Sequence, residues 1–120
     1  MVIPIRLLAA AAVTAALSAG CDNQRKQDCE RFLAAMSPLD EGMPSVDTVN
    51  RVNKEVGALN LHDQPLQIYA ENYRKTLTVL ASTLAVKESD SPPDGTDDVI
   101  KSRLREARTD KDDTARYCAQ

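Results

Sequence analysis

Aromatic residues and histidine are scarce in this 120-residue sequence, which contains no Trp, one Phe (Phe32), three Tyr and a single His (His62). One histidine excludes the multi-histidine zinc and di-iron sites that helical bundles can hold, and it leaves little scope for a histidine-based catalytic triad. Because His62 lies in a polar stretch, we interpret it as an exposed loop residue. The core must be built from Leu, Val, Ile and Met.

An excess of positive charge is also missing. The chain has 15 basic and 18 acidic residues; Arg6 is the only charged residue among the first 20, so the remainder has 14 basic and 18 acidic residues, net −4. A nucleic-acid partner would require a basic face, and attraction to anionic lipids would require a polybasic segment. We therefore predict no nucleic-acid partner.

Several site motifs are absent as well. The sequence has no glycine-rich nucleotide loop, no nucleophile elbow and no Cys-x-x-Cys pair. When the calcium-loop template is counted from Asp90, at the start of the acidic segment Asp90–Asp98, Pro92 and Lys101 do not fit it. Met36 and Met43 are more typical of core filling than of copper ligation. We predict no metal, no other cofactor and no enzymatic activity.

The N-terminal segment carries the most specific signal in the sequence. Arg6 precedes an uncharged run from Leu7 to Leu17, and the small residues Ser18, Ala19 and Gly20 then lead to Cys21. The apolar stretch is too short to span a bilayer, which takes about 20 apolar residues. It is typical of a signal peptide over residues 1–20, cleaved between Gly20 and Cys21.

The residues Leu17-Ser18-Ala19-Gly20-Cys21 resemble the lipobox of bacterial lipoproteins. In that family the cysteine is acylated and becomes the N-terminus, so the resemblance implies a lipid anchor on Cys21, in the cell membrane and facing the periplasm. Asp22 directly after the cysteine is typical of enteric lipoproteins that stay in the inner membrane, although this sorting rule differs between lineages. Because the Leu stands four residues before Cys21 rather than three, an ordinary secreted protein with a free Cys21 is the alternative.

Residues 21–120 read as one all-α domain after a short tether at 21–24. We expect a first helix over about Asn23–Met36, a second capped by Ser45, a third capped by Asp63 or Gln64 and ending near Val86, and a fourth after a loop at 87–95. Apolar spacing predicts which residues of each helix point inward. They are, on the first helix, Cys29, Phe32, Leu33 and Met36; on the second, Val46, Val49, Val52 or Asn53, Val56 and Leu59; on the third, Leu66, Ala70, Tyr73, Leu77, Leu80 and Leu84; and on the fourth, Ile100, Leu104, Ala107, Thr114 and Cys118.

Some local features remain as separate expectations. Thr96 is expected to cap the fourth helix, and Lys111 to interrupt its apolar face, so that 110–113 is its weakest stretch. Leu66, Tyr69 and Tyr73 could form an interaction surface, although core and boundary positions are favoured. Four helices with short links favour an antiparallel four-helix bundle, and a three-helix bundle is the alternative.

Once Cys21 is assigned to the lipid anchor, two cysteines remain that could form a disulfide, Cys29 and Cys118. An antiparallel bundle brings the start of its first helix and the end of its fourth to the same end, so we predict a disulfide between these two cysteines. It would stabilise the fold by about 4–5 kcal/mol in the chain-entropy model. The alternative is a reactive thiol or metal-binding pair.

The mature chain, with Tyr117-Cys118 near its C-terminus, resembles small uncharacterised helical lipoproteins of bacterial envelopes, which brings no known activity with it. Our leading hypothesis is a non-enzymatic, lipid-anchored module that binds or positions another envelope protein. Capture of a small ligand or metal within the bundle and an immunity or exclusion role are the alternatives.

Overall fold

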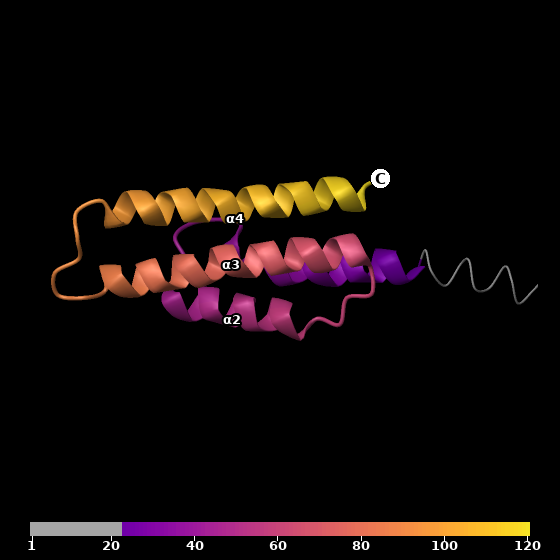
Figure 1. Cartoon of the computed structure of the whole chain (residues 1–120), viewed down its shortest axis with the longest axis horizontal. Coiled ribbons are helices and arrows are strands. Elements are labelled where there is room, and N and C mark those ends of the chain that lie inside the picture. Colours follow the sequence, from indigo (N-terminus) through magenta and orange to yellow (C-terminus); the bar gives the residue numbers. More distant parts are fainter. Residues whose placement is uncertain (1–22) are drawn as a thin grey trace, which may run out of the picture.

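The computed structural model describes residues 23–120, and this part of the chain is helical, without any strand. It consists of an N-terminal helix over residues 23–36, a short 3-10 helix η1 (Ser37–Leu39), α2 (Val46–Ala58), α3 (Gln64–Lys87) and α4 (Thr96–Cys118) (Figure 1). The four long helices pack against one another, which confirms the predicted all-α bundle. None of these helices is both long and apolar enough to cross a membrane.

The N-terminal helix buries the face that the sequence predicts. Cys29, Phe32 and Met36 are buried, and Leu33 packs against the same core while partly exposed. The helix covers residues 23–36, as expected, and so includes residues 23 and 24, which we also assigned to the tether. Pro38 then lies in the first turn of η1, where its missing N–H removes no internal hydrogen bond.

Helix α2 begins with the predicted side-chain cap Ser45, and of the two caps considered for α3, Asp63 and Gln64, the structure has Asp63. Ser45 Oγ accepts a hydrogen bond from the Thr48 N–H at 3.1 Å, and Asp63 Oδ2 accepts one from the Leu66 N–H at 3.3 Å. Each cap pairs a backbone donor that the first turn of a helix leaves without a partner, and is worth about 1 kcal/mol. These two residues therefore fix where each helix starts.

Helix α3 packs against both α2 and α4. All six of its predicted inward residues are buried, and each large apolar side chain so placed stabilises the fold by about 1.5–3 kcal/mol. Tyr73 is only 1% exposed, and Tyr69 is half-buried against the core. The flank of Leu66, Tyr69 and Tyr73 is therefore core and core edge, not an open surface.

One expectation for α4 is wrong. Its N-cap is Gly95, in the left-handed conformation with φ of 88°, because the Thr96 hydroxyl donates instead to the Pro93 carbonyl oxygen at 2.6 Å. The helix is continuous through residues 110–113, the stretch that we expected to be its weakest. Lys111 is partly buried, and its Nζ forms an ion pair with Asp40 beside η1.

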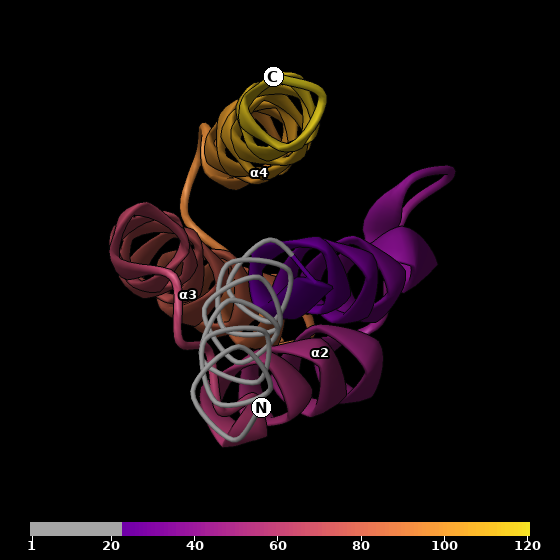
Figure 2. The same cartoon turned by 90° about the vertical axis from the view of Figure 1, so that its right-hand side faces the viewer.

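The bundle has two structurally different ends. Figure 1 shows α3 and α4 side by side along their whole length, with α2 along part of α3 on the side away from α4. In Figure 2 the N-terminal helix has α3 to its left, α4 above it and α2 below it. At the tied end, the N-terminal helix, the link at 59–63 and the end of α4 are joined by side-chain contacts. The opposite, hairpin end contains the loop at 88–95 between α3 and α4.

Candidate functional site

The two cysteines that the sequence pairs are joined at the tied end. Cys29 of the N-terminal helix and Cys118, the last residue of α4, form a disulfide with their Cα atoms 5.9 Å apart. Cys29 is buried, and Cys118 is partly buried against the core. The predicted disulfide is confirmed, and it fixes the two ends of the described chain to each other.

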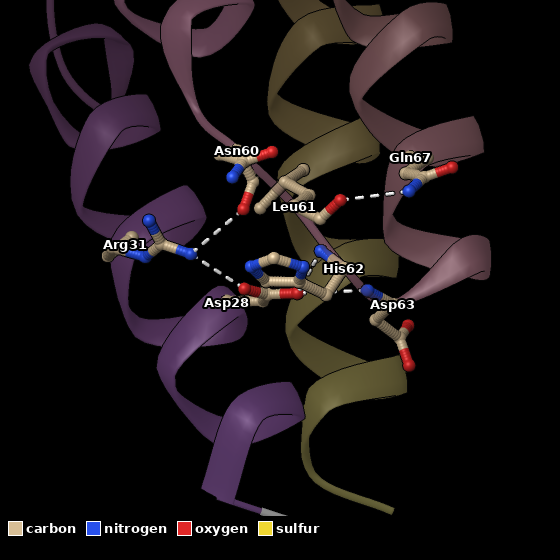
Figure 3. Close-up of polar contacts among 7 residues, drawn as sticks. All are labelled: Asp28, Arg31, Asn60, Leu61, His62, Asp63 and Gln67. Atoms are coloured by element: carbon tan, nitrogen blue, oxygen red, sulfur yellow. Dashed lines mark hydrogen bonds and ion pairs between the residues drawn. The ribbon is translucent and has the colours of Figure 1, made fainter. Parts of the chain in front are cut away.

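A buried aspartate beside this disulfide holds a separate segment in place. Asp28 has no exposed surface, and its Oδ2 accepts hydrogen bonds from the backbone N–H groups of His62 at 2.7 Å and Asp63 at 2.9 Å. Arg31 Nη2 donates to Asp28 Oδ1 at 2.7 Å and to the Asn60 carbonyl oxygen at 3.2 Å (Figure 3). The carboxylate therefore connects the N-terminal helix to the link between α2 and α3.

This link is held along its whole length. Gln67 Nε2, from the first turns of α3, donates to the Leu61 carbonyl oxygen at 2.8 Å (Figure 3). Together with the contacts of Asp28 and Arg31, each residue from 60 to 63 thus has a backbone group bonded to a side chain. Backbone groups outside regular structure must find partners in this way when they are buried. The link is consequently a fixed part of the fold.

The same donors decide the ionisation of Asp28. Burial raises the pKa of a carboxyl group, because it removes water from the charged form. Here the N–H groups of Asp63 and His62 and the guanidinium of Arg31 outweigh burial, and the pKa of Asp28 lies below its ordinary value of 3.8. A general acid or base needs a pKa near the working pH and access to a substrate. Asp28 has neither, so we interpret it as a structural clamp.

Asp63 extends the tied end to α4. Its Oδ2, besides capping α3, accepts a hydrogen bond from the Tyr117 hydroxyl at 2.7 Å. Arg25 Nη2 donates to the Tyr117 carbonyl oxygen at 3.0 Å, and the guanidinium carbon lies 4.5 Å from the centroid of the Tyr117 ring. Burial and the hydrogen bond to Asp63 raise the pKa of Tyr117. The phenol therefore remains a hydrogen-bond donor at neutral pH.

A second carboxylate, in the interface between α3 and α4, has a different environment. Asp110 Oδ2 lies 3.3 Å from the buried Thr76 Oγ1, and Glu106 Oε1 lies 3.4 Å from the same hydroxyl. Burial raises the pKa of Asp110; the hydrogen bond with Thr76 opposes this, and the charges of Glu106 and Asp113 add to it. Within residues 23–120, no cation forms an ion pair with Asp110.

Asp28, Arg25 and Arg31 are the residues of the tied end that the sequence analysis missed. Asp28 stands four residues before Phe32, so helical spacing alone places it on the same buried face. Arg31 stands three residues after Asp28, about one helical turn away, and can therefore reach it. That signal could have identified a buried ion pair. The backbone donors of His62 and Asp63 are more than 30 residues away in the sequence and give no such signal.

The other residues considered in the sequence analysis take no part in a reactive site. The His62 side chain is exposed, as predicted, and the residue contributes only its backbone N–H to the clamp. Met36 fills the core, but Met43 is 53% exposed, so that prediction is wrong for Met43. In the described part of the chain, no group of three or more His, Cys, Asp and Glu side chains is placed to hold a metal ion. Gly20 and Cys21 lie outside the described residues.

No protein-family model, curated protein or solved structure matches this chain. The tied end can therefore be interpreted only from its own contacts. They consist of a covalent bond, a carboxylate whose two oxygens both accept hydrogen bonds and a helix cap shared with a tyrosine. These contacts fix three segments of the chain relative to one another.

Proposed function

We propose that the protein is a lipid-anchored module of the bacterial envelope that binds another envelope protein. The observation that carries this proposal is the position of Cys21, which follows a lipobox-like sequence and stands eight residues before Cys29, itself joined to Cys118. A lipid on Cys21 would hold the tied end beside the bilayer, with the hairpin end directed into the periplasm. Asp22 favours the inner membrane as the site of anchoring.

The contacts of the tied end support a positioning role. The disulfide, Asp28 and Asp63 join three segments of the chain close to the proposed anchor. From this base α3 extends for 24 residues, a length of about 36 Å at 1.5 Å per residue. An anchored module with a fixed base and a long helical arm is suited to presenting its side faces to a neighbouring protein.

Labelling of living bacteria with an alkyne-bearing palmitate analogue tests the anchor. We expect the full chain to incorporate the label and to fractionate with membranes, and we expect Cys21→Ala to lose both properties. The double variant Cys29→Ala/Cys118→Ala is the matched control, because it lacks two cysteines but should still be labelled. Equal labelling of Cys21→Ala would show that the lipid is not on this residue.

Crosslinking in cells tests the binding role. The full chain and Cys21→Ala are each crosslinked, purified under denaturing conditions and analysed by mass spectrometry. We expect a defined envelope protein to be crosslinked to the anchored chain and depleted from the Cys21→Ala sample. A chain that remains strictly monomeric, with no protein above background, would contradict the proposal.

A further inference from the structure

An arginine of α3 lies directly against a glycine of α2. A Cβ atom built on Gly57 would lie only 2.5 Å from Arg74 Cζ and 2.6 and 2.8 Å from its two Nη atoms. These distances are shorter than any real Cβ contact, so any residue other than glycine would displace the guanidinium. Gly57 thus forms a seat for the Arg74 guanidinium, which we call the Gly57 notch.

A chain of three hydrogen bonds orients this guanidinium. The Thr78 hydroxyl donates to the Arg74 carbonyl oxygen at 2.9 Å, Asn53 Nδ2 donates to Thr78 Oγ1 at 3.1 Å, and Arg74 Nε donates to Asn53 Oδ1 at 2.8 Å. Within residues 23–120, neither Nη atom of Arg74 forms a hydrogen bond or ion pair. Paired N–H groups of an oriented guanidinium are the geometry that binds a carboxylate through both oxygens.

The surface beside the notch is positively charged on an acidic protein. An open hollow of about 470 Å³ is lined by Asn50, Asn53, Lys54, Gly57, Ala58 and Arg74, with no carboxylate among these residues. The whole chain has a net charge of −3. Two cations and two amides therefore gather at one hollow of a surface that is otherwise rich in acids, which favours an anionic ligand.

A second hollow adjoins the first across Arg74 and Gly57. It has a volume of about 410 Å³ and a mixed lining, in which Val56, Leu59, Leu61 and Ala70 form the apolar part and Asn60, Gln67, Lys75 and Thr78 a polar part. Its one acidic lining residue, Glu71, is paired with Lys75 at 3.4 Å. Apolar walls beside a guanidinium suit a carboxylate carried on a hydrocarbon stem better than a bare inorganic anion.

We propose that Arg74, seated on the Gly57 notch, binds the carboxylate of an Asp or Glu side chain from a segment of a partner protein. Arg74 takes the carboxylate, Lys54 adds charge, and the hydrocarbon part of the segment lies against the apolar walls of the second hollow. This names the chemistry of the partner in the proposed function, and it rests on that function only for the partner's location in the envelope.

Nuclear magnetic resonance titration of the purified full chain in a mild nonionic detergent tests the site. The probes are acetyl-Ala-Leu-Glu-Leu-Ala-amide, the same peptide with Gln in place of Glu, and inorganic phosphate, all at constant ionic strength. We expect the Glu peptide to shift the Arg74 Nε–H and Asn53 side-chain amide signals to saturation. The Gln peptide should bind about tenfold more weakly, because it offers no charge-assisted hydrogen bonds.

Two variants that each lose one positive charge distinguish binding at this site from general electrostatic attraction. Arg74→Gln should weaken binding of the Glu peptide by about tenfold or more. Arg105→Gln removes an exposed charge from α4, at a residue that lines neither hollow, so it should leave binding within about twofold.

Gly57→Ala tests the notch itself. Its methyl group should displace the guanidinium and weaken binding of the Glu peptide about as much as Arg74→Gln, while the Tm stays at or above that of the original chain, because Ala favours helix more than Gly. Wild-type binding by Gly57→Ala or Arg74→Gln, equal binding of the Glu and Gln peptides, or saturation by phosphate below the concentration needed for the Glu peptide would each overturn the proposal. None of these outcomes depends on the lipid anchor. A negative result would therefore contradict the carboxylate site without contradicting the proposed anchored function.

Discussion

The tied end and the hairpin end of the bundle are held by different kinds of interaction. At the tied end a disulfide, the buried Asp28 with its three donors and the Asp63–Tyr117 hydrogen bond join three segments. At the hairpin end the ion pair between Lys87 and Asp97, 3.0 Å apart, is largely exposed to solvent. Nearby Val79, Val86 and Val99 are each more than 40% exposed. Covalent and buried polar contacts are thus concentrated at the tied end.

The stability of the bundle should therefore differ along its length. Regions with few buried contacts and exposed polar interactions open locally at a lower free-energy cost than regions with buried networks. We therefore expect backbone amides at the hairpin end to exchange with solvent sooner than those at the tied end. Substitutions that remove single contacts at either end should change this difference in stability.

Removal of the disulfide should have the largest effect. For a bond between residues 89 apart in sequence, the chain-entropy model gives a loss of about 4–5 kcal/mol in the free energy of unfolding, as an upper value. Chemical denaturation of Cys29→Ala/Cys118→Ala measures it, with the reduced original chain as a control that should agree. Hydrogen exchange should then show similar protection at the two ends. A loss below about 1 kcal/mol would mean that the tied end does not depend on this bond.

Replacement of Asp28 should have the next largest effect. Asp28→Ala leaves the N–H groups of His62 and Asp63 without their acceptor, and each buried donor so left costs about 1–3 kcal/mol. Asp28→Asn retains one acceptor oxygen and should lose less. Asp90→Asn, in the exposed loop, is the matched control and should change the free energy of unfolding by less than about 0.5 kcal/mol. Equal effects of Asp28→Asn and Asp90→Asn would contradict the clamp.

The contribution of Asp28 should also depend on pH. Because its pKa is lowered in the folded chain, its ionised form stabilises the fold above the unfolded pKa of about 3.9. That stability is lost as the pH falls through the lowered pKa. The difference between the original chain and Asp28→Asn should therefore shrink below about pH 4, as measured by denaturation between pH 7 and pH 2.

Asp110 should give a smaller effect of the opposite sign. Its pKa is raised, since burial and the charges of Glu106 and Asp113 disfavour its ionised form. Asp110→Asn should therefore increase the free energy of unfolding at pH 7, by about 0.5 kcal/mol for the relief of like-charge neighbours on one helix. Acidification through the raised pKa should give the original chain part of the same gain. A destabilised Asp110→Asn would show that the Thr76 contact with the carboxylate outweighs burial.

The ion pair at the hairpin end should matter least. Lys87 and Asp97 keep 47% and 67% of their side-chain surfaces exposed, and such pairs contribute about 0.2–1 kcal/mol because solvent and salt screen them. Lys87→Gln should lower the free energy of unfolding by an amount near the lower value, and the effect should vanish at high salt. A loss as large as that of Asp28→Ala would contradict the proposed contrast between the ends.

The sequence predicted the helices well where a periodic pattern or a cap was present. The stripe of α3 and the cap Ser45 were identified, and the cap of α3 was narrowed to Asp63 or Gln64, because each depends on residues within a few positions of one another. The prediction failed at Thr96, because its hydroxyl bonds to the Pro93 carbonyl oxygen in the preceding turn and leaves Gly95 as the N-cap.

The helical class, the inward faces, the pairing of Cys29 with Cys118 and the lipobox-like segment that motivates the proposed anchor all follow from the amino-acid sequence. They depend on spacing and on residue types that can be read along the chain. That Asp28 is an ionised clamp, and that Arg74 sits against Gly57 and lines an open hollow, is visible only once the chain is folded. The physical reason is that burial, the pKa of a carboxyl group and the orientation of a guanidinium all depend on donors and neighbours that folding brings together from distant parts of the chain.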